Sequence, residues 1–336
     1  MRGSTGHTAV SVVIALSLWA VCVRSVSAIT FATLDAPLGA LGTYPSGVSG
    51  NKVVGYFQDA SYQYHGFLHD GSTWLTLNAP NAAYRTVARA ISGNNIVGYF
   101  QDASGSLDGF VYDGTSWTTL NDPAAARAGY GIGDTAPTGI DGGNIVGIYG
   151  PGSGGRSGFL YDGSTWTSLA YPGADFTYAT GTSGGNVVGF YQNYVFGALR
   201  AHGFEFNGST WTTLDDPSAN TPTFNGDGTY INGIFGRYIV GGFQVSHNGN
   251  QEGHGFLYDG STWTTIDEPL SSSLNNGTSV TGIYGNTIIG YYYDGVGFNY
   301  PHGFIATVPE PSTFALMLIA AVVSLALRWR PRRASA

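Results

Sequence analysis

The stretch His254–Pro269, HGFLYDGSTWTTIDEP, decides the fold because most of it recurs along the chain. Its Gly-Phe pair occurs six times, and successive pairs are separated by 43, 49, 45, 52 and 48 residues. The glycines of these pairs are Gly66, Gly109, Gly158, Gly203, Gly255 and Gly303. Self-similarity at a period of about 40–50 residues is typical of architectures in which each repeat is one supersecondary unit. The chain is therefore interpreted as six copies of one unit.

Each copy contains enough short strands to form a sheet of its own. A β-branched pair and a glycine, as in Ile239-Val240-Gly241, precede every Gly-Phe pair, and the pattern W-x-[TS]-[LI]-x-x-P follows five of them, as at Trp263. In the second copy the strands are TVARAIS, NIVGYFQD, DGFVYDG and SWTTLN, with Gly, Asp and Asn at the joints. No stretch between the two ends has helical periodicity. Four strands per copy predict an all-β fold, a six-bladed β-propeller.

An offset in the repeat predicts that the ring is closed by the beginning of the chain. The tryptophan segment is missing after the sixth Gly-Phe pair, whereas a related segment, FATLDAP, occupies Phe31–Pro37. Phe31 stands where the other copies have tryptophan. A linear row of repeats would leave unpaired strand edges, which proteins avoid. We therefore predict that Phe31–Asp35 is the outer strand of the blade built from Ser279–Ala306.

Glycine and aspartate have structural roles in this interpretation. The glycines of the Val-Gly and Gly-Phe positions predict close approach of a neighbouring backbone, or a bulge. Asp-Gly before Ser-Thr-Trp predicts a hairpin turn between the third and fourth strands. The aspartates that precede the turn glycine are predicted to cap the turn with their side chains, and they are Asp70, Asp113, Asp162 and Asp259.

Two resemblances follow from the same residues. The HGFLYDG unit with its upstream Ile-Val-Gly resembles the HAF family of extracellular repeats, although the chain has HGF where that family has HAF. This resemblance covers nearly all of residues 29–308 and implies no activity. The DGSTW segment is similar to the Asp box of sialidase-type propellers, but it is one residue shorter between Asp and Trp and lacks the leading Ser. The Asp box stabilises a turn, so it does not imply sialidase activity.

The N-terminal segment has the layout of a secretory signal peptide. An apolar run, Ala9–Val23, follows Arg2, and the small residues Val26 and Ala28 stand where a signal peptidase would read them. Residues 1–28 are therefore predicted to be removed, and the alternative is an N-terminal membrane anchor. Residues 29–307 are predicted to form the propeller.

The other end, residues 308–336, is predicted to be a sorting tail with a short transmembrane helix. The apolar run Phe314–Leu327 is followed by arginines, which should remain cytoplasmic and leave the propeller outside. Pro309, Glu310 and Pro311, with Ser-Thr, the apolar run and the arginines behind them, resemble the PEP-CTERM sorting signal. The alternative is a plain tail anchor.

The PEP-CTERM resemblance implies a partner and a destination. In that family an exosortase, a membrane-embedded cysteine protease and transpeptidase of Gram-negative bacteria, processes the tail. Such proteins reach the outer cell envelope or leave the cell, often in species that secrete exopolysaccharide. We therefore expect a protein that is transiently anchored in the inner membrane and then exported.

Charge and cysteine content exclude several classes of function. Residues 29–308 contain seven Lys and Arg against 20 Asp and Glu, a formal net charge of −13. A surface of this sign repels phosphate backbones, so we expect no nucleic-acid partner. Cys22 is the only cysteine, which leaves no disulfide and no thiolate site after residue 28. We expect no metal and no cofactor, and we interpret the histidines at one repeat position as structural: His65, His202, His254 and His302.

Candidate binding residues lie where the repeats differ. Three copies have a tyrosine three residues before the position of the first strand that is usually glycine. These are Tyr44, Tyr178 and Tyr230, and the other copies have Val87, Ala136 and Ser279. Arg89 is one of the blade-specific positive charges. Aromatic faces with a few polar groups suit sugars, so these tyrosines and Arg89 are predicted to bind a ligand at the channel mouth.

The favoured function is a non-catalytic exported propeller that binds or organises extracellular polysaccharide. The alternatives are an extracellular polysaccharide hydrolase or lyase, and a protein-interaction platform. No catalytic residue is predicted, because the acidic residues follow the repeat instead of marking a few blades.

Overall fold

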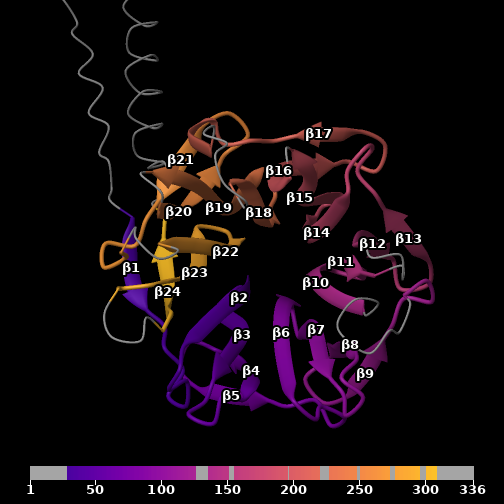
Figure 1. The fold of residues 1–336 in the computed structure, drawn as a ribbon. Helices are drawn as coiled ribbons and strands as arrows, with labels where there is room; N and C mark the ends of the chain where they lie inside the picture. The colour runs from indigo at the N-terminus through magenta and orange to yellow at the C-terminus, as the bar shows by residue number, and fades with distance from the viewer. Residues whose placement is uncertain are drawn as a thin grey trace, which may run out of the picture.

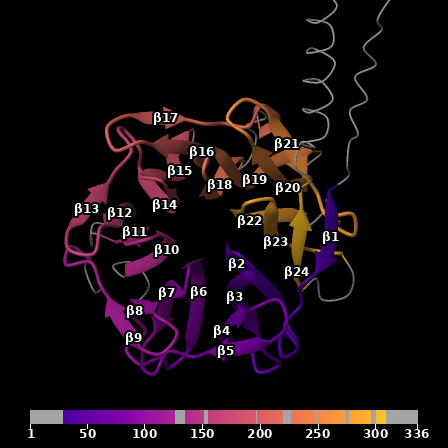
Figure 2. The ribbon, with the colours of Figure 1, turned by 180° about the vertical axis from the view of Figure 1, so that it is seen from behind.

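The chain folds as a ring of antiparallel sheets around a central axis (Figure 1). The computed structural model describes residues 29–125, 135–150, 155–195, 197–219, 227–247, 250–272, 277–295 and 300–308. The view from behind shows the same ring, with one strand of each blade nearest the axis (Figure 2). The all-β, six-bladed propeller predicted from the repeat is therefore confirmed.

Each blade has four strands, numbered outward from the axis. Blade 1 contains β2 (Thr43–Ser49), β3 (Lys52–Gln58), β4 (Tyr64–His69) and β5 (Trp74–Leu77). Blade 2 contains β6 (Arg85–Ser92), β7 (Asn95–Gln101), β8 (Leu107–Tyr112) and β9 (Trp117–Leu120). Blade 3 contains β10 (Thr135–Asp141), β11 (Asn144–Tyr149), β12 (Ser157–Tyr161) and β13 (Trp166–Leu169).

The second half of the ring repeats this order. Blade 4 contains β14 (Phe176–Ser183), β15 (Asn186–Val195), β16 (Ala198–Phe206) and β17 (Trp211–Thr213), and a short 3-10 helix, η1 (Pro217–Ala219), follows it. Blade 5 contains β18 (Gly228–Phe235), β19 (Tyr238–His247), β20 (Asn250–Tyr258) and β21 (Trp263–Ile266). Blade 6 contains β22 (Thr278–Tyr284), β23 (Thr287–Tyr292), β24 (His302–Thr307) and, from the start of the chain, β1 (Thr30–Thr33).

The first strand closes the ring as predicted. In both views β1 lies beside β24, and the two strands pair antiparallel with Phe31 opposite Ala306 (Figures 1 and 2). The ring centroids of Phe31 and Phe304 are 5.6 Å apart. Tryptophan takes the place of Phe31 in the other five blades, with centroid distances of 4.8–5.0 Å. The strand ends at Thr33, two residues before the predicted end, and the Asp35 side chain accepts a bond from the backbone N–H of Gly303.

The core lies between neighbouring blades. Six hydrophobic clusters each join one blade to the next, and the last of them joins blade 6 to blade 1. The phenylalanines of the Gly-Phe pairs are at most 1% exposed and are Phe67, Phe110, Phe159, Phe204, Phe256 and Phe304. A Cβ atom on Gly241 would meet the carbonyl oxygen of Tyr230 and would lie 2.8 Å from the Phe256 ring. The predicted close approach at this glycine is therefore confirmed.

The outer turns also follow the prediction. Asp259 Oδ1 accepts bonds from the backbone N–H groups of Ser261 and Thr262, at 2.9 and 2.8 Å, and Gly260 has a φ of +94°. The hydroxyl of Ser261 also donates to Asp259, and these bonds hold the pKa of the carboxyl below its usual range. The same turn occurs at Asp70, Asp113, Asp162 and Asn207. Turn capping explains these repeated aspartates.

The predicted sorting segments fall outside the described residues. These are the signal peptide, Pro309, Glu310 and Pro311, and the C-terminal apolar run. Within the part of the chain that the structure describes, no helix has the length and apolar character needed to cross a membrane.

Candidate functional site

A bulge in the innermost strand of every blade turns one side chain toward the axis. In β22, for example, the pairing with β23 shifts between Val280 and Gly282, so Thr281 is left out of the register. Bulges re-aim a side chain in this way. The six residues at this position are Ser46, Arg89, Thr138, Thr180, Asn232 and Thr281. All six line one cavity of about 120 Å³, here called the axial cavity, together with Tyr44, Tyr56, Ser279 and Tyr291.

Four of the six bulge side chains bond to the next blade. The Thr281 hydroxyl donates to the carbonyl of Pro45 at 2.7 Å. Equivalent bonds join Thr138 to Ala179, Thr180 to Ile231, and Asn232 to Val280, at 2.7, 2.8 and 2.7 Å. Ser46 instead donates to Tyr44 in its own strand, at 3.2 Å. In blade 2, where Arg89 replaces a small polar residue, no such bond to blade 3 forms among the described residues.

Arg89 is half-buried and differs in charge from everything around it. The lining of the axial cavity contains no carboxylate among the described residues, and none of them forms an ion pair with Arg89. Burial raises the pKa of Tyr56 well above its usual range, although the charge of Arg89 acts in the opposite direction. Burial also raises the pKa of Tyr44. The cavity thus combines one cation with tyrosine hydroxyls that keep their protons.

A second cavity opens between blades 5 and 6, and it is here called the mouth cavity. Its volume is about 370 Å³. Its aromatic walls are Phe190, Tyr230, Phe243, Tyr291 and Tyr293, and its polar lining includes Asn232, Gln244, His254 and Ser279. Asn232, Ser279 and Tyr291 line both cavities, so the two cavities are neighbours.

The two blades that flank the mouth cavity each lack one ring of an aromatic pair that blades 1 and 4 contain. In blades 1 and 4, an aromatic residue of the first strand stacks on one of the second: Tyr44 on Tyr56 at 4.6 Å, and Tyr178 on Phe190 at 4.5 Å between ring centroids. Blade 5 has Tyr230 opposite Gly242, and blade 6 has Ser279 opposite Tyr291. Each of these two blades therefore has one ring where blades 1 and 4 have two. Blade 2 also has one ring, with Val87 opposite Tyr99, and blade 3 has none, with Ala136 opposite Ile148.

The structure separates the four residues that the sequence grouped. Tyr44 and Arg89 line the axial cavity, and Tyr230 lines the mouth cavity. Tyr178 lines neither; its ring stacks on Phe190, and the Arg156 guanidinium carbon is 5.9 Å from its centroid. Tyr178 is thus placed behind a cavity wall.

Several lining residues were missed by sequence reasoning. Tyr56, Phe190 and Tyr291 follow the glycine of the Val-Gly or Ile-Gly pair, and Gly242 occupies the same position in blade 5. A comparison of that position across the repeats would have found them, and would have marked Gly242 as the exception. Tyr293, two residues after Tyr291, is specific to blade 6.

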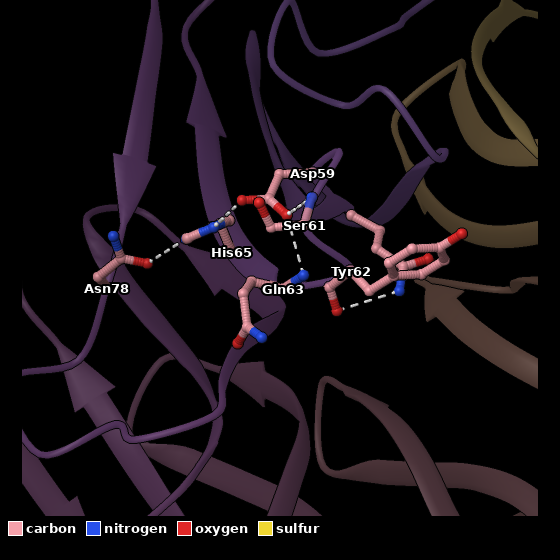
Figure 3. A network of polar contacts seen from close by, with 7 residues as sticks. Asp59, Ser61, Tyr62, Gln63, His65 and Asn78 are labelled. Atoms are coloured by element: carbon pink, nitrogen blue, oxygen red, sulfur yellow. Dashed lines mark hydrogen bonds and ion pairs between the residues drawn. The ribbon is translucent and has the colours of Figure 1, made fainter.

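The repeated histidines are bonded within their own blades. His65 lies between Asn78 and Asp59, with Nδ1 2.8 Å from Asn78 Oδ1 and Nε2 3.2 Å from Asp59 Oδ2 (Figure 3). His202 bonds to Asp215 at 2.8 Å, and that bond raises the pKa of the imidazole. His254 with Asp267, and His302 with Asp35, repeat this contact. No group of three or more His, Cys, Asp or Glu in the described ranges is arranged to hold a metal ion.

Comparison with known families identifies the end of the chain. A model of the PEP-CTERM protein-sorting motif matches residues 307–333. The chain therefore carries this motif, which implies processing by an exosortase. A search of curated proteins gives no match to the chain. The resemblance of the body to HAF repeats stays a prediction.

Solved structures with a similar fold include both sugar-binding and enzymatic proteins. A mutant of the Aleuria aurantia lectin in complex with Fucalpha1-6GlcNAc is 17% identical, with 80% of this chain and 96% of that chain covered and a TM-score of 0.46. Trypanosoma rangeli sialidase is 14% identical, with 84% and 56% covered and a TM-score of 0.47. The β-propeller domain of the Trilobed protease from Pyrococcus furiosus is 10% identical, with 81% and 97% covered and a TM-score of 0.44. These likenesses concern the fold alone.

Proposed function

We propose that the protein is an exported, non-catalytic propeller that binds or organises extracellular polysaccharide through its mouth cavity. Export follows from the sorting motif, which implies transient anchoring at the membrane and processing by an exosortase. The outer cell envelope or the extracellular space is the proposed destination. The observation that carries the binding function is the aromatic cavity whose lining includes Gly242 and Ser279.

The lining of the mouth cavity suits a sugar ring. Its volume of about 370 Å³ lies in the range of about 300–1,000 Å³ that is usual for small-molecule sites. Tyr230 and Tyr291 offer aromatic faces for the C–H surface of a sugar, while Asn232 and Gln244 can bond its hydroxyl groups. Burial raises the pKa of Tyr230 and of Tyr293 to about 12, so both hydroxyls are neutral hydrogen-bond donors near pH 7.

A hydrolase or lyase is the second candidate because Tyr44, Tyr56 and Arg89 converge on the axis. The usual glycosidase mechanism needs two carboxylic groups beside the scissile bond. Neither cavity has a carboxylate in its described lining. A tyrosine acting as base would need a lowered pKa, whereas burial raises that of Tyr44 and Tyr56. Binding without catalysis is therefore the favoured function.

Filling the cavity tests this proposal. The processed protein would be purified from its host, and its binding to the polysaccharide secreted by that host would be measured by calorimetry. Gly242→Phe places a ring where blade 4 has Phe190, and it should weaken binding about tenfold or more, since a central aromatic site contributes about 1–2 kcal/mol or more. Tyr230→Ala should weaken binding to a similar extent.

The matched control is Ile148→Phe, which adds the same ring at the equivalent position of blade 3, outside both described cavity linings. Equal binding by the Gly242→Phe and Ile148→Phe proteins would reject the mouth cavity as the site. The length of the polysaccharide after incubation, measured by size-exclusion chromatography, should be unchanged. Shortening would instead establish the enzymatic alternative.

A further inference from the structure

The axial cavity contains a positive charge that the fold does not explain. Arg89 is the only arginine or lysine in the described lining of the two cavities, and it belongs to a body with a formal net charge of −13. The residues at the same bulge position in the other blades are serine, threonine or asparagine. The three threonines and the asparagine each bond to the following blade, whereas Arg89 makes no such bond among the described residues.

The partial burial of the Arg89 charge is unfavourable unless an anion binds beside it. A partly buried charge loses hydration, and only a counter-ion or several hydrogen bonds offset that loss. Within the described ranges Arg89 has neither a carboxylate partner nor a carboxylate among the residues that share its cavity. Threonine or asparagine at this position bonds to the next blade in blades 3, 4, 5 and 6. The arginine therefore indicates a ligand and not a structural role.

The residues around Arg89 are suited to an anion. Tyr44, Tyr56 and Tyr291 line the same cavity, and their rings are held in place by contact with one another: Tyr44 stacks on Tyr56 at 4.6 Å and meets the edge of Tyr291 at 5.4 Å between centroids. Burial keeps the hydroxyls of Tyr44 and Tyr56 protonated by raising their pKa. Neutral donors beside one guanidinium can bond an anion without adding a competing negative charge.

We propose that the axial cavity is an anion subsite in which Arg89 holds the carboxylate of an acidic sugar whose ring lies in the mouth cavity. The ligand class is therefore a polysaccharide that contains uronic acid. This inference rests on the proposed function, because the two cavities share Asn232, Ser279 and Tyr291. A volume of about 120 Å³ accommodates a carboxylate, and the planar guanidinium matches a carboxylate in a bidentate pair.

The test compares an acidic ligand with a neutral one of the same length. Oligosaccharides of glucuronate and of glucose would be titrated into the processed protein by calorimetry. We expect the acidic ligand to bind about tenfold or more tightly, because a hydrogen bond to a charged group contributes about 1.5–3 kcal/mol. Arg89→Thr should remove that preference, so that the acidic and the neutral ligand bind equally, whereas Arg89→Lys should retain part of it.

Arg89→Thr is the informative variant because blades 3, 4 and 6 already have threonine at this bulge. The new hydroxyl can donate to the next blade, as Thr138 does to Ala179, so the melting temperature should be unchanged or higher. A clearly lower melting temperature would assign Arg89 to blade packing and overturn the proposal. Retention of the acidic preference by this variant would also overturn it.

The outcomes separate this subsite from the proposed function. Equal binding of the two ligands by the wild-type protein would overturn the anion subsite and leave the mouth cavity as a neutral-sugar site. Failure of both ligands to bind would overturn the anion subsite, and failure of the host polysaccharide to bind as well would overturn the proposed function itself. Glucose 6-sulfate serves as a third probe. If it bound more tightly than glucuronate, the assignment of the subsite to a carboxylate would be overturned.

Discussion

The rim and the axis of the propeller come from the same six repeats, but the repeats agree at the rim and differ at the axis. At the rim, every blade packs an aromatic residue on its buried phenylalanine, and Phe31 takes the place of tryptophan in blade 6. At the axis, Arg89 replaces a small polar residue and Gly242 replaces a larger side chain. Residues that the repeats share close the ring, and residues in which one repeat differs from the others line a cavity.

The neighbouring glycines Gly241 and Gly242 provide the largest test of this difference. Alanine at Gly241 would press its Cβ against the carbonyl oxygen of Tyr230, while alanine at Gly242 would lie 3.2 Å from the carbonyl oxygen of His254 and touch little else. We expect Gly241→Ala to lower the free energy of unfolding by about 3 kcal/mol or more, and Gly242→Ala by less than about 1 kcal/mol. Denaturant unfolding measures both. Similar losses would contradict the assignment of Gly241 to the ring and Gly242 to the cavity.

The closing strand provides the next test. Leu34 follows β1 and is 7% exposed, and Leu77 occupies the same repeat position in blade 1 at 2%. Each side chain packs into a cluster that joins two blades. Leu34→Ala and Leu77→Ala should each lower the free energy of unfolding by about 2–4 kcal/mol. A much smaller loss for Leu34→Ala would show that the first strand does not hold the ring closed in solution.

The smallest expected effect concerns the bonds around the axis. Thr281→Val removes a hydroxyl that donates to Pro45 in the next blade, whereas Ser46→Ala removes one that bonds only within its own strand. Thermal unfolding should show a loss of about 1 kcal/mol for Thr281→Val and less than half of that for Ser46→Ala. A reversed order would mean that the bonds between blades at the axis do not stabilise the ring.

Much of the fold could be predicted because its signals are local. The Gly-Phe pairs, the Asp-Gly turns and the position of Phe31 can each be read from a few residues, and each predicted its contact correctly. The bulges could not be read in the same way. Nothing near Arg89 in the sequence distinguishes a residue that leaves the register and turns inward from one that remains paired.

The candidate site was therefore predicted only in part. Tyr44, Tyr230 and Arg89 do line cavities, while Tyr178 stacks behind a wall. Tyr44 lines a cavity although it stacks on Tyr56 as Tyr178 stacks on Phe190, so the difference depends on the blades that surround each ring and not on its own strand pair. A pattern confined to the first strand does not contain that information.

By itself the sequence determined the number of blades, the closing strand and the sorting motif, because repeated apolar positions, turn residues and a terminal signal each act over a short length of chain. Only the tertiary structure decided which side chains meet at the axis. Closing the ring brings Ser46 of the first blade beside Thr281 of the last, and six bulges turn residues that are far apart in the chain into one lining. Register and closure act between strands, so no single segment of the chain could reveal that cavity.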